Sequence, residues 1–271
     1  MKMSDTTNAG DRCRGVLVGL AVGDQIGGPI RMAVRLAESL AACNGFNPSD
    51  ILDRYLIWWR EGAFDTGPVG ARALQLLASG MPVQEATAQV HREFGGRTAG
   101  CNPAHRSPPL SMLASIADED LAACVMAEAG LTHHDPLAGE VAAAVNGLCR
   151  ALVRGVRWEE ALGGCPRFAG TGGPGNDGGY APDVLGAAMH FVATSGCFDQ
   201  ALDRSLAFAG PANYCPVLVG AIGGGRWGAS AIPPSSLAHV DLLPRVRVAA
   251  EALAVEWVVR VCFELNQLEN E

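Results

Sequence analysis

Two aspartates lie at glycine-containing turns, and either could act on a substrate. Asp24 ends a small-residue run within Arg14–Pro29, and Asp65 stands two residues before Gly67, where a helical pattern begins. A carboxylate in such a place can act as a general acid or base. We predict Asp65 as the first catalytic candidate and Asp24 as the second. Asp24 could equally be a turn residue, and Asp65 or Thr66 could cap the following helix.

The segment from Gly100 to Leu110 places an amide, an imidazole and a guanidinium in one short loop. Such a loop can present backbone N–H groups and a fork of donors to phosphate. We therefore predict that Asn102 and Arg106 bind ligand and that His105 serves as a catalytic acid or base, since an imidazole titrates near neutral pH. The alternative for His105 is an ordinary core or surface histidine.

A glycine-rich segment runs from Gly170 to Asp183 and allows a ligand to approach the backbone closely. We predict ligand contacts at four of its residues, Gly173, Gly175, Gly178 and Tyr180. A flexible surface loop is the alternative for this stretch, and Asp183 is predicted to be structural.

A smaller polar cluster, Leu131–Pro136, precedes a long apolar pattern. We predict His133 as a ligand-binding residue. Thr132 or Asp135 could instead simply cap the helix.

The elements that must position these residues read as helices. Apolar residues recur three and four apart in most of the chain, whereas alternating strand patterns are weak. The expected helices cover residues 15–22, 32–42, 48–60, 67–77, 83–94, 121–129, 137–153, 184–193, 198–208, 217–227 and 245–265. We predict one all-α domain over residues 11–271, preceded by a disordered segment, residues 1–10.

Composition excludes several classes of function. The 271 residues carry a net charge of −8 with no run of Lys or Arg, which argues against binding to nucleic acid or to an anionic membrane. The polar N-terminus has no signal-peptide core, and we expect no apolar stretch long enough to span a bilayer. The nine cysteines form no C-x-x-C pair, so we expect reduced thiols and a cytoplasmic protein.

Taken in order, these segments resemble the ADP-ribosylglycohydrolase family. Its opening pattern R-G-x-x-x-G-x-A-x-G-D-x-x-G matches Arg14–Gly27, and its D-x-G matches Asp65 and Gly67. Its G-x-N-x-x-x-R-x-x-P-L, T-H-x-x-P and G-G-Y-x-x-D patterns match the three later segments, and a glycine-spaced pattern followed by I-P matches Gly220–Pro233. The resemblance implies a single-domain orthogonal helical bundle with the ligand in a central cleft. It also implies hydrolysis of the bond at the ribose anomeric carbon, with two Mg²⁺ ions in the cleft.

The sequence departs from this family at the metal ligands. The early T-D-D-T pattern falls on Gly27, Gly28, Pro29 and Ile30, and the late G-D-x-D-T pattern falls on Gly210–Tyr214. Neither segment contains a carboxylate, so we predict no metal and no other cofactor. Asn213 stands where an aspartate would and is expected to bind ligand. Arg31, beside the vacated positions, could replace part of the lost positive charge.

Two functions follow from this combination. The first is a metal-independent hydrolase of an N-glycosidic bond to ribose in an ADP-ribosyl, NAD-like, nucleoside or nucleotide-like substrate. The second is a catalytically inactive regulator that binds an ADP-ribose-like ligand. Either protein would bind a small ribosyl ligand and act as a monomer, or as a homodimer through the helix expected at residues 245–265.

Overall fold

The computed structural model describes residues 6–164, 167–168, 178–212, 214–233, 236, 239 and 241–268. Within these ranges all regular elements are helices. Gly100 and Tyr180 pair through an isolated antiparallel β-bridge that belongs to no strand. The long helices are α1 (Thr6–Gly23), α2 (Gly28–Cys43), α3 (Pro48–Arg60), α4 (Gly67–Ala78), α5 (Val83–Glu93), α8 (Asp118–Ala129), α9 (Pro136–Val153), α11 (Ala181–Ala193), α12 (Phe198–Ala209), α13 (Tyr214–Trp227) and α14 (Leu243–Leu268).

These helices confirm the all-α prediction, and their bounds differ from it mainly at the ends. The helix α1 begins at Thr6, so residues 6–10 belong to it rather than to the disordered segment that we expected. Three short helices were not predicted: α6 (Asn102–Arg106), α7 (Pro109–Met112) and α10 (Trp158–Gly163). The first two are too short to show an apolar period, and prolines interrupt their sequence.

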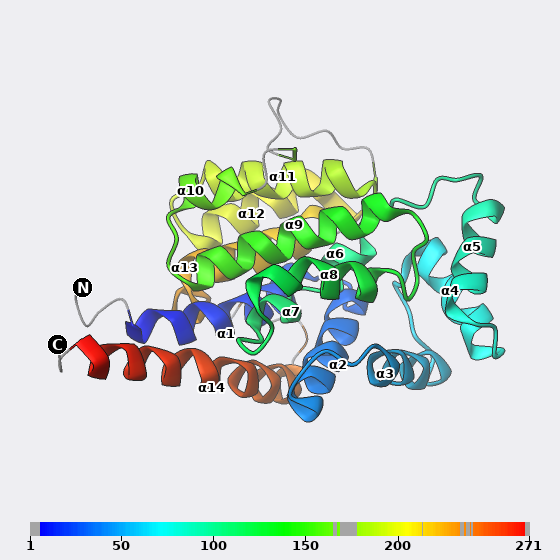
Figure 1. The fold of residues 1–271 in the computed structure, drawn as a ribbon. Coiled ribbons are helices and arrows are strands. Elements are labelled where there is room, and N and C mark those ends of the chain that lie inside the picture. The colour runs from blue at the N-terminus through cyan, green and yellow to red at the C-terminus, as the bar shows by residue number, and fades with distance from the viewer. Residues whose placement is uncertain are drawn as a thin grey trace.

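Helices α1 and α13 form the centre of the molecule and run antiparallel in close contact (Figure 1). A Cβ atom at Gly15 would overlap the carbonyl oxygen of Gly224, and one at Gly19 would overlap that of Gly220. Glycine at these positions therefore lets the two backbones approach one another directly. The contact brings the last residues of α1 beside the first turn of α13, where the candidate site lies.

The other helices cover this pair. Helix α9 packs on α8 and α13, and α14 lies along α1 at the opposite side (Figure 1). The 18 residues of α9 are long and apolar enough to cross a membrane by length and composition, contrary to our expectation from the sequence. However, 61% of them are buried inside the molecule, as expected for a core helix.

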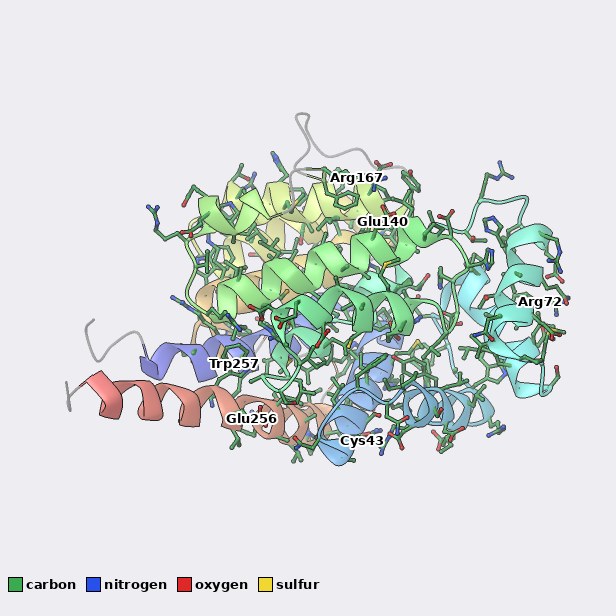
Figure 2. The ribbon with its side chains drawn as sticks, in the orientation of Figure 1. Cys43, Arg72, Glu140, Arg167, Glu256 and Trp257 are labelled. Atoms are coloured by element: carbon green, nitrogen blue, oxygen red, sulfur yellow. The ribbon has the colours of Figure 1, made fainter. Side chains whose placement is uncertain are left out.

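Helices α3, α4 and α5 extend to one side of the bundle (Figure 1). Arg72 on α4 forms a bidentate ion pair with Glu93 on α5, with N–O distances of 2.8 and 2.9 Å. Figure 2 shows Arg72 at this edge, far from Trp257, which lies on the side of α14 that faces the bundle. The indole nitrogen of Trp257 donates a 2.6 Å hydrogen bond to the carbonyl of Met112.

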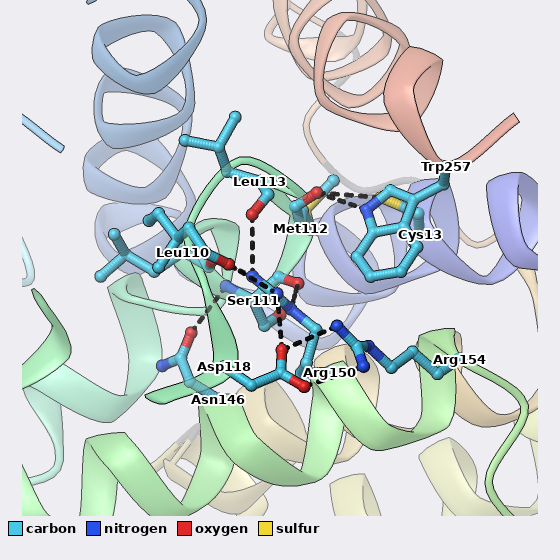
Figure 3. A network of polar contacts seen from close by, with 11 residues as sticks. Cys13, Leu110, Ser111, Met112, Leu113, Asp118, Asn146, Arg150, Arg154 and Trp257 are labelled. Atoms are coloured by element: carbon cyan, nitrogen blue, oxygen red, sulfur yellow. Dashed lines mark hydrogen bonds and ion pairs between the residues drawn. The ribbon is translucent and has the colours of Figure 1, made fainter. Parts of the chain in front are cut away.

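Arg150 on α9 fixes the segment that follows the candidate ligand loop (Figure 3). Its buried guanidinium donates to four backbone carbonyls, those of Ser111, Ile116, Leu110 and Leu113, at 2.6 to 3.2 Å. It also pairs with Asp118 at 3.1 Å. One side chain thus donates hydrogen bonds to several backbone carbonyls that lack a partner within a regular helix.

Replacing Arg150 with Met is expected to lower the free energy of unfolding by about 3 kcal/mol, because four carbonyls lose their donor in a buried place. Urea denaturation at pH 7 measures the loss. Arg154→Met is the matched control, since Arg154 binds the same Asp118 from an exposed position and should change stability by less than about 1 kcal/mol. Equal losses in both variants would contradict this role.

Candidate functional site

A cavity of about 590 Å³ opens where several helices begin, and it collects many of the residues singled out from the sequence. Its size falls in the range of small-molecule sites. Its polar and aromatic lining comprises Asp65, Phe94, Arg97, Asn102, His105, Asp135, Tyr180 and Tyr214. Pro29, Gly67, Pro68, Val69, Gly96, Ala99, Gly100, Cys101, Leu137, Gly179 and Ala212 complete the lining.

One wall of the cavity is made by two loops that pair with each other. The N–H of Cys101 donates to the carbonyl of Gly179 at 2.9 Å, and the N–H of Ala181 donates to the carbonyl of Ala99 at 3.0 Å. This pairing joins the Asn102 segment to the Tyr180 segment, which lie about eighty residues apart in the chain. It explains how two motifs distant in sequence line one site.

Asp65 reaches the cavity from the turn before α4. Its φ of 52° lies in the left-handed region, which few residues other than glycine adopt. Burial, together with the charge of nearby Asp24, raises the pKa of its carboxyl to about 6, although a hydrogen bond from the Gly28 backbone opposes the shift. A strained residue with a shifted carboxyl is a feature of functional sites. Neither Asp65 nor Thr66 caps α4 with its side chain.

Asp24 lies outside the cavity lining, which corrects our prediction of a catalytic role. Its fully buried carboxylate accepts hydrogen bonds from the N–H groups of Ile26, Gly27 and Ile30 at 3.2, 2.7 and 2.8 Å. Three backbone donors make this carboxylate the anchor between α1 and α2. The alternative of a turn residue therefore describes Asp24 better, and its effect on the site is the charge it places near Asp65.

His105 and Asn102 line the cavity from α6. Asn102 sits against the start of α4, since a Cβ atom at Gly67 would lie 2.6 Å from its Oδ1. His105 is 3% exposed, is bonded to the backbone of Tyr214, and leaves its Nε2 without a partner. Burial lowers the pKa of this imidazole to about 4. At neutral pH His105 is thus suited to hydrogen bonding a ligand rather than to acting as a charged acid.

Arg106 faces away from the cavity, which corrects the prediction that it binds ligand. Its Nε donates to Glu128 at 2.6 Å, and its guanidinium lies 5.4 Å from the ring centroid of Tyr55. The hydroxyl of Tyr55 donates to the same carboxylate oxygen at 2.8 Å. All three side chains are buried, so Arg106 attaches α6 to the core and only indirectly positions Asn102 and His105.

His133 lies behind the cavity wall and not on it. Its Nδ1 is 2.8 Å from the hydroxyl of Thr132, and its Nε2 would be 3.4 Å from a Cβ atom at Gly100. It lines a separate hollow beside Leu131 and His134, which corrects its predicted ligand role. Asp135, by contrast, caps α9, because its side chain accepts a 3.0 Å hydrogen bond from the N–H of Leu137. Helix capping by Asp135 was one of the alternatives drawn from the sequence.

Only part of the glycine-rich segment Gly170–Asp183, where we predicted ligand contacts, lies within the described residues. Gly178 has a φ of 80° and does not line the cavity, whereas its neighbour Gly179 does. The ligand contact expected at Gly178 stays a prediction. Gly173, Gly175 and Asn213 lie outside the described residues. Tyr180 does line the cavity and is 45% exposed.

Sequence reasoning missed Phe94, Arg97 and Tyr214 and treated Asp135 only as a cap. The chain has three tyrosines, of which Tyr55 is buried whereas Tyr180 and Tyr214 are exposed on the cavity. Nothing local marks Arg97, which follows two glycines at the end of α5. It stands three residues before Gly100 at the start of the same loop, and this loop brings it to the cavity.

The two buried histidines predict a pH-dependent stability. Burial lowers the pKa of His105 to about 4 and, aided by the charge of Arg106, that of His133 to about 3. The unfolded chain binds protons near pH 6.5 and the folded chain does so only well below, so stability falls as the pH drops from 6.5 toward 4. Between pH 7 and 5 we expect a combined loss of about 3 kcal/mol.

Urea denaturation of the wild type and of the His105→Gln/His133→Gln double variant at both pH values tests this expectation. The variant should lose much less stability on acidification. The raised pKa of Asp65 acts in the opposite sense, because this carboxyl protonates in the folded state first. His190→Gln, on α11 away from the cavity, is the control. Parallel pH curves for the double variant and the wild type would refute the assignment.

The residues present do not fit the pair of Mg²⁺ ions that the family resemblance implied. Two positions in the expected metal segments, Pro29 and Ala212, do border the cavity, but both are apolar. No group of three His, Cys, Asp or Glu side chains gathers anywhere in the described ranges. Asp24 is saturated by backbone donors and Asp135 caps α9. A binuclear site needs several carboxylate oxygens, which this lining lacks.

Comparisons with known proteins identify the family and support the helical fold. The family model for ADP-ribosylglycohydrolase matches residues 30–264. The ADP-ribosyl-[dinitrogen reductase] glycohydrolase of Rhodospirillum rubrum is 22% identical, over 86% of this chain and 91% of its own. A solved structure described as an ADP-ribosylglycohydrolase-related protein complex superposes with a TM-score of 0.76 and 27% identity, covering 92% of this chain and 98% of that one. The chain belongs to the ADP-ribosylglycohydrolase family.

Proposed function

We propose that this chain hydrolyses an N-glycosidic bond to ribose in a small ribosyl or nucleotide-like substrate, and that it does so without a binuclear metal site. The observation that carries the proposal is Asp65, held in a left-handed conformation at the edge of a cavity in a fold whose family is named for glycohydrolases. The described cysteines are free thiols, which supports the proposal that the protein acts in the reducing cytoplasm.

The proposed step uses the groups that line the cavity. Ionised Asp65 accepts a proton from water as the water oxygen attacks the anomeric carbon, and its charge stabilises the oxocarbenium-like state. The C–N bond breaks, and the leaving nitrogen keeps the electron pair and takes up a proton from solvent. Asp65 returns the proton it accepted to solvent and is again ionised. Asn102 and the unpartnered Nε2 of His105 would orient the sugar by hydrogen bonds.

A binding protein without turnover is the second candidate, and one observation favours it. Of the three carboxylates in or near the described lining, Asp24 and Asp135 accept hydrogen bonds from backbone N–H groups, which leaves Asp65 as the principal acid or base. Glycosidases ordinarily use two carboxyl groups. A site with one would depend on an easily departing nitrogen base or else would not turn over.

Titration calorimetry and an assay for the released nitrogen base on the same EDTA-treated protein separate the two functions. The panel comprises ADP-ribose, NAD, nucleotides and nucleosides. Binding with release of the base is the result expected for the hydrolase. Binding of a ligand that is never cleaved, at any pH between 6 and 9, would overturn the hydrolase and establish the binding protein.

A further inference from the structure

The charge around the cavity limits what it can hold. Among the described lining residues Arg97 is the one cation, and its guanidinium makes no ion pair or hydrogen bond with them. The same lining contains the carboxylates of Asp65 and Asp135, and Asp24 is buried near Asp65. His105 adds no charge at neutral pH. An anionic ligand would therefore meet more negative than positive groups.

Helix N-termini supply the remaining positive potential, and it is modest. Six helices begin at the cavity, namely α2, α4, α6, α9, α11 and α13. Asp135 already caps the start of α9, and the first turn of every one of the six contains a proline that removes an N–H donor, at Pro29, Pro68, Pro103, Pro136, Pro182 and Pro216. The dipoles can favour one anionic group but present few free donors for two.

Aromatic and apolar surface dominates the rest of the lining. Phe94, Tyr180 and Tyr214 offer ring surfaces, and Val69 and Leu137 add aliphatic ones. The two tyrosines are 45% and 37% exposed, so their rings remain open to a ligand. A planar base stacks on such surfaces at little cost in desolvation. The cavity thus combines an aromatic region for a base with hydrogen-bonding groups, Asn102 and His105, for a sugar.

We propose that the substrate is a ribonucleoside carrying at most one phosphate group, and not an ADP-ribosyl group with its pyrophosphate. The phosphate, when present, pairs with Arg97 at the rim. This inference rests on the proposed function, which supplies the ribosyl bond that is cleaved. The limit of one phosphate group follows from the charges, the helix starts and the aromatic side chains of the cavity lining. Pro29 and Ala212 at the metal segments are apolar, and Arg31 beside them pairs with Asp241 at 2.9 Å and does not line the cavity, so it does not offset a second phosphate.

Calorimetry with adenosine, inosine, AMP and ADP-ribose tests the proposal directly. The nucleosides or AMP should bind at least about 10-fold more tightly than ADP-ribose. Arg97→Gln should weaken AMP about 10-fold and leave the nucleosides unchanged, because it removes the single cation. Arg92→Gln is the matched control, since Arg92 is exposed at the end of α5 and does not line the cavity.

The outcomes separate this inference from the proposed function. Tighter binding of ADP-ribose than of AMP and the nucleosides would overturn the substrate class, and release of adenine from it would leave the hydrolase standing. A nucleoside that binds well but is not cleaved would support the class and count against the hydrolase. An Arg97→Gln variant that binds AMP like the wild type, or a wild type that binds none of the four compounds, would overturn the class.

Discussion

Replacing Asp65 with Asn is expected to lower kcat/KM for the cleaved ribosyl compound about 10³-fold and to change ligand affinity much less. Asn keeps the size of the side chain and tolerates the left-handed conformation at this position. It cannot accept a proton from water or provide a negative charge beside the developing oxocarbenium ion. The loss should therefore fall on kcat rather than on binding.

The pH dependence gives a second measure of the same residue. Since burial and the charge of Asp24 raise the pKa of Asp65 to about 6, kcat/KM should fall below pH 6 as this carboxyl is protonated. The Asn variant should show no such fall in its residual rate. It should also be more stable than the wild type at pH 7.5 but not at pH 4, because it removes a charge that folding disfavours.

Asp183→Asn is the matched control for both measurements. Asp183 lies in the first turn of α11 but does not line the cavity. Its replacement should leave the rate and the pH profile unchanged. A full rate in the Asp65→Asn variant, or a loss of equal size in both variants, would remove Asp65 from the mechanism.

Gly220→Ala is expected to destabilise the fold by about 3 kcal/mol, or to leave no soluble protein, since its methyl group would overlap the carbonyl oxygen of Gly19. The neighbouring atoms are backbone on both sides, so no flexible side chain can move away. The helices α1 and α13 would have to separate along their length. That separation would also displace Asp24 and Tyr214 at the site.

The same substitution in an open place supplies the control. A Cβ atom at Gly147 on α9 would have no atom within 4 Å, and this residue is exposed. Gly147→Ala should raise the free energy of unfolding by about 0.5 to 1 kcal/mol, through the higher helix propensity of alanine. Thermal denaturation of both variants measures the difference. Two changes of the same sign would contradict the close contact of α1 with α13.

The sequence predicted the long helices because their apolar residues repeat over several turns. Helix α9 shows this well, since its predicted and observed bounds differ by one residue. The short helix α6, which supplies Asn102 and His105 to the cavity, and the short helix α7 after it have too few residues to display a period. The family patterns predicted the bundle because they extend over most of the chain, and the structural similarity confirms it.

The site was predictable where one motif supplies a residue directly to the cavity, as Asp65, Asn102, His105 and Tyr180 show. It was not predictable where a distant partner decides the role. Arg106 looks like a ligand residue until Glu128 is found buried against it. Asp24 looks catalytic until three N–H groups occupy its carboxylate. Tyr214 reaches the cavity only through the packing of helices far apart in the chain, whereas Arg97 belongs to the same loop as Asn102 but no pattern marked it.

Hydrolysis of the N-glycosidic bond by EDTA-treated protein, measured as released base before and after Mg²⁺ is restored, tests the central claim most directly. The substrate is whichever ribosyl compound binds most tightly in calorimetry. The proposed mechanism predicts a measurable rate in EDTA that added Mg²⁺ changes by less than about 2-fold, because Asp65 and the cavity need no cation. A rate that appears only when Mg²⁺ is restored would contradict the proposed mechanism.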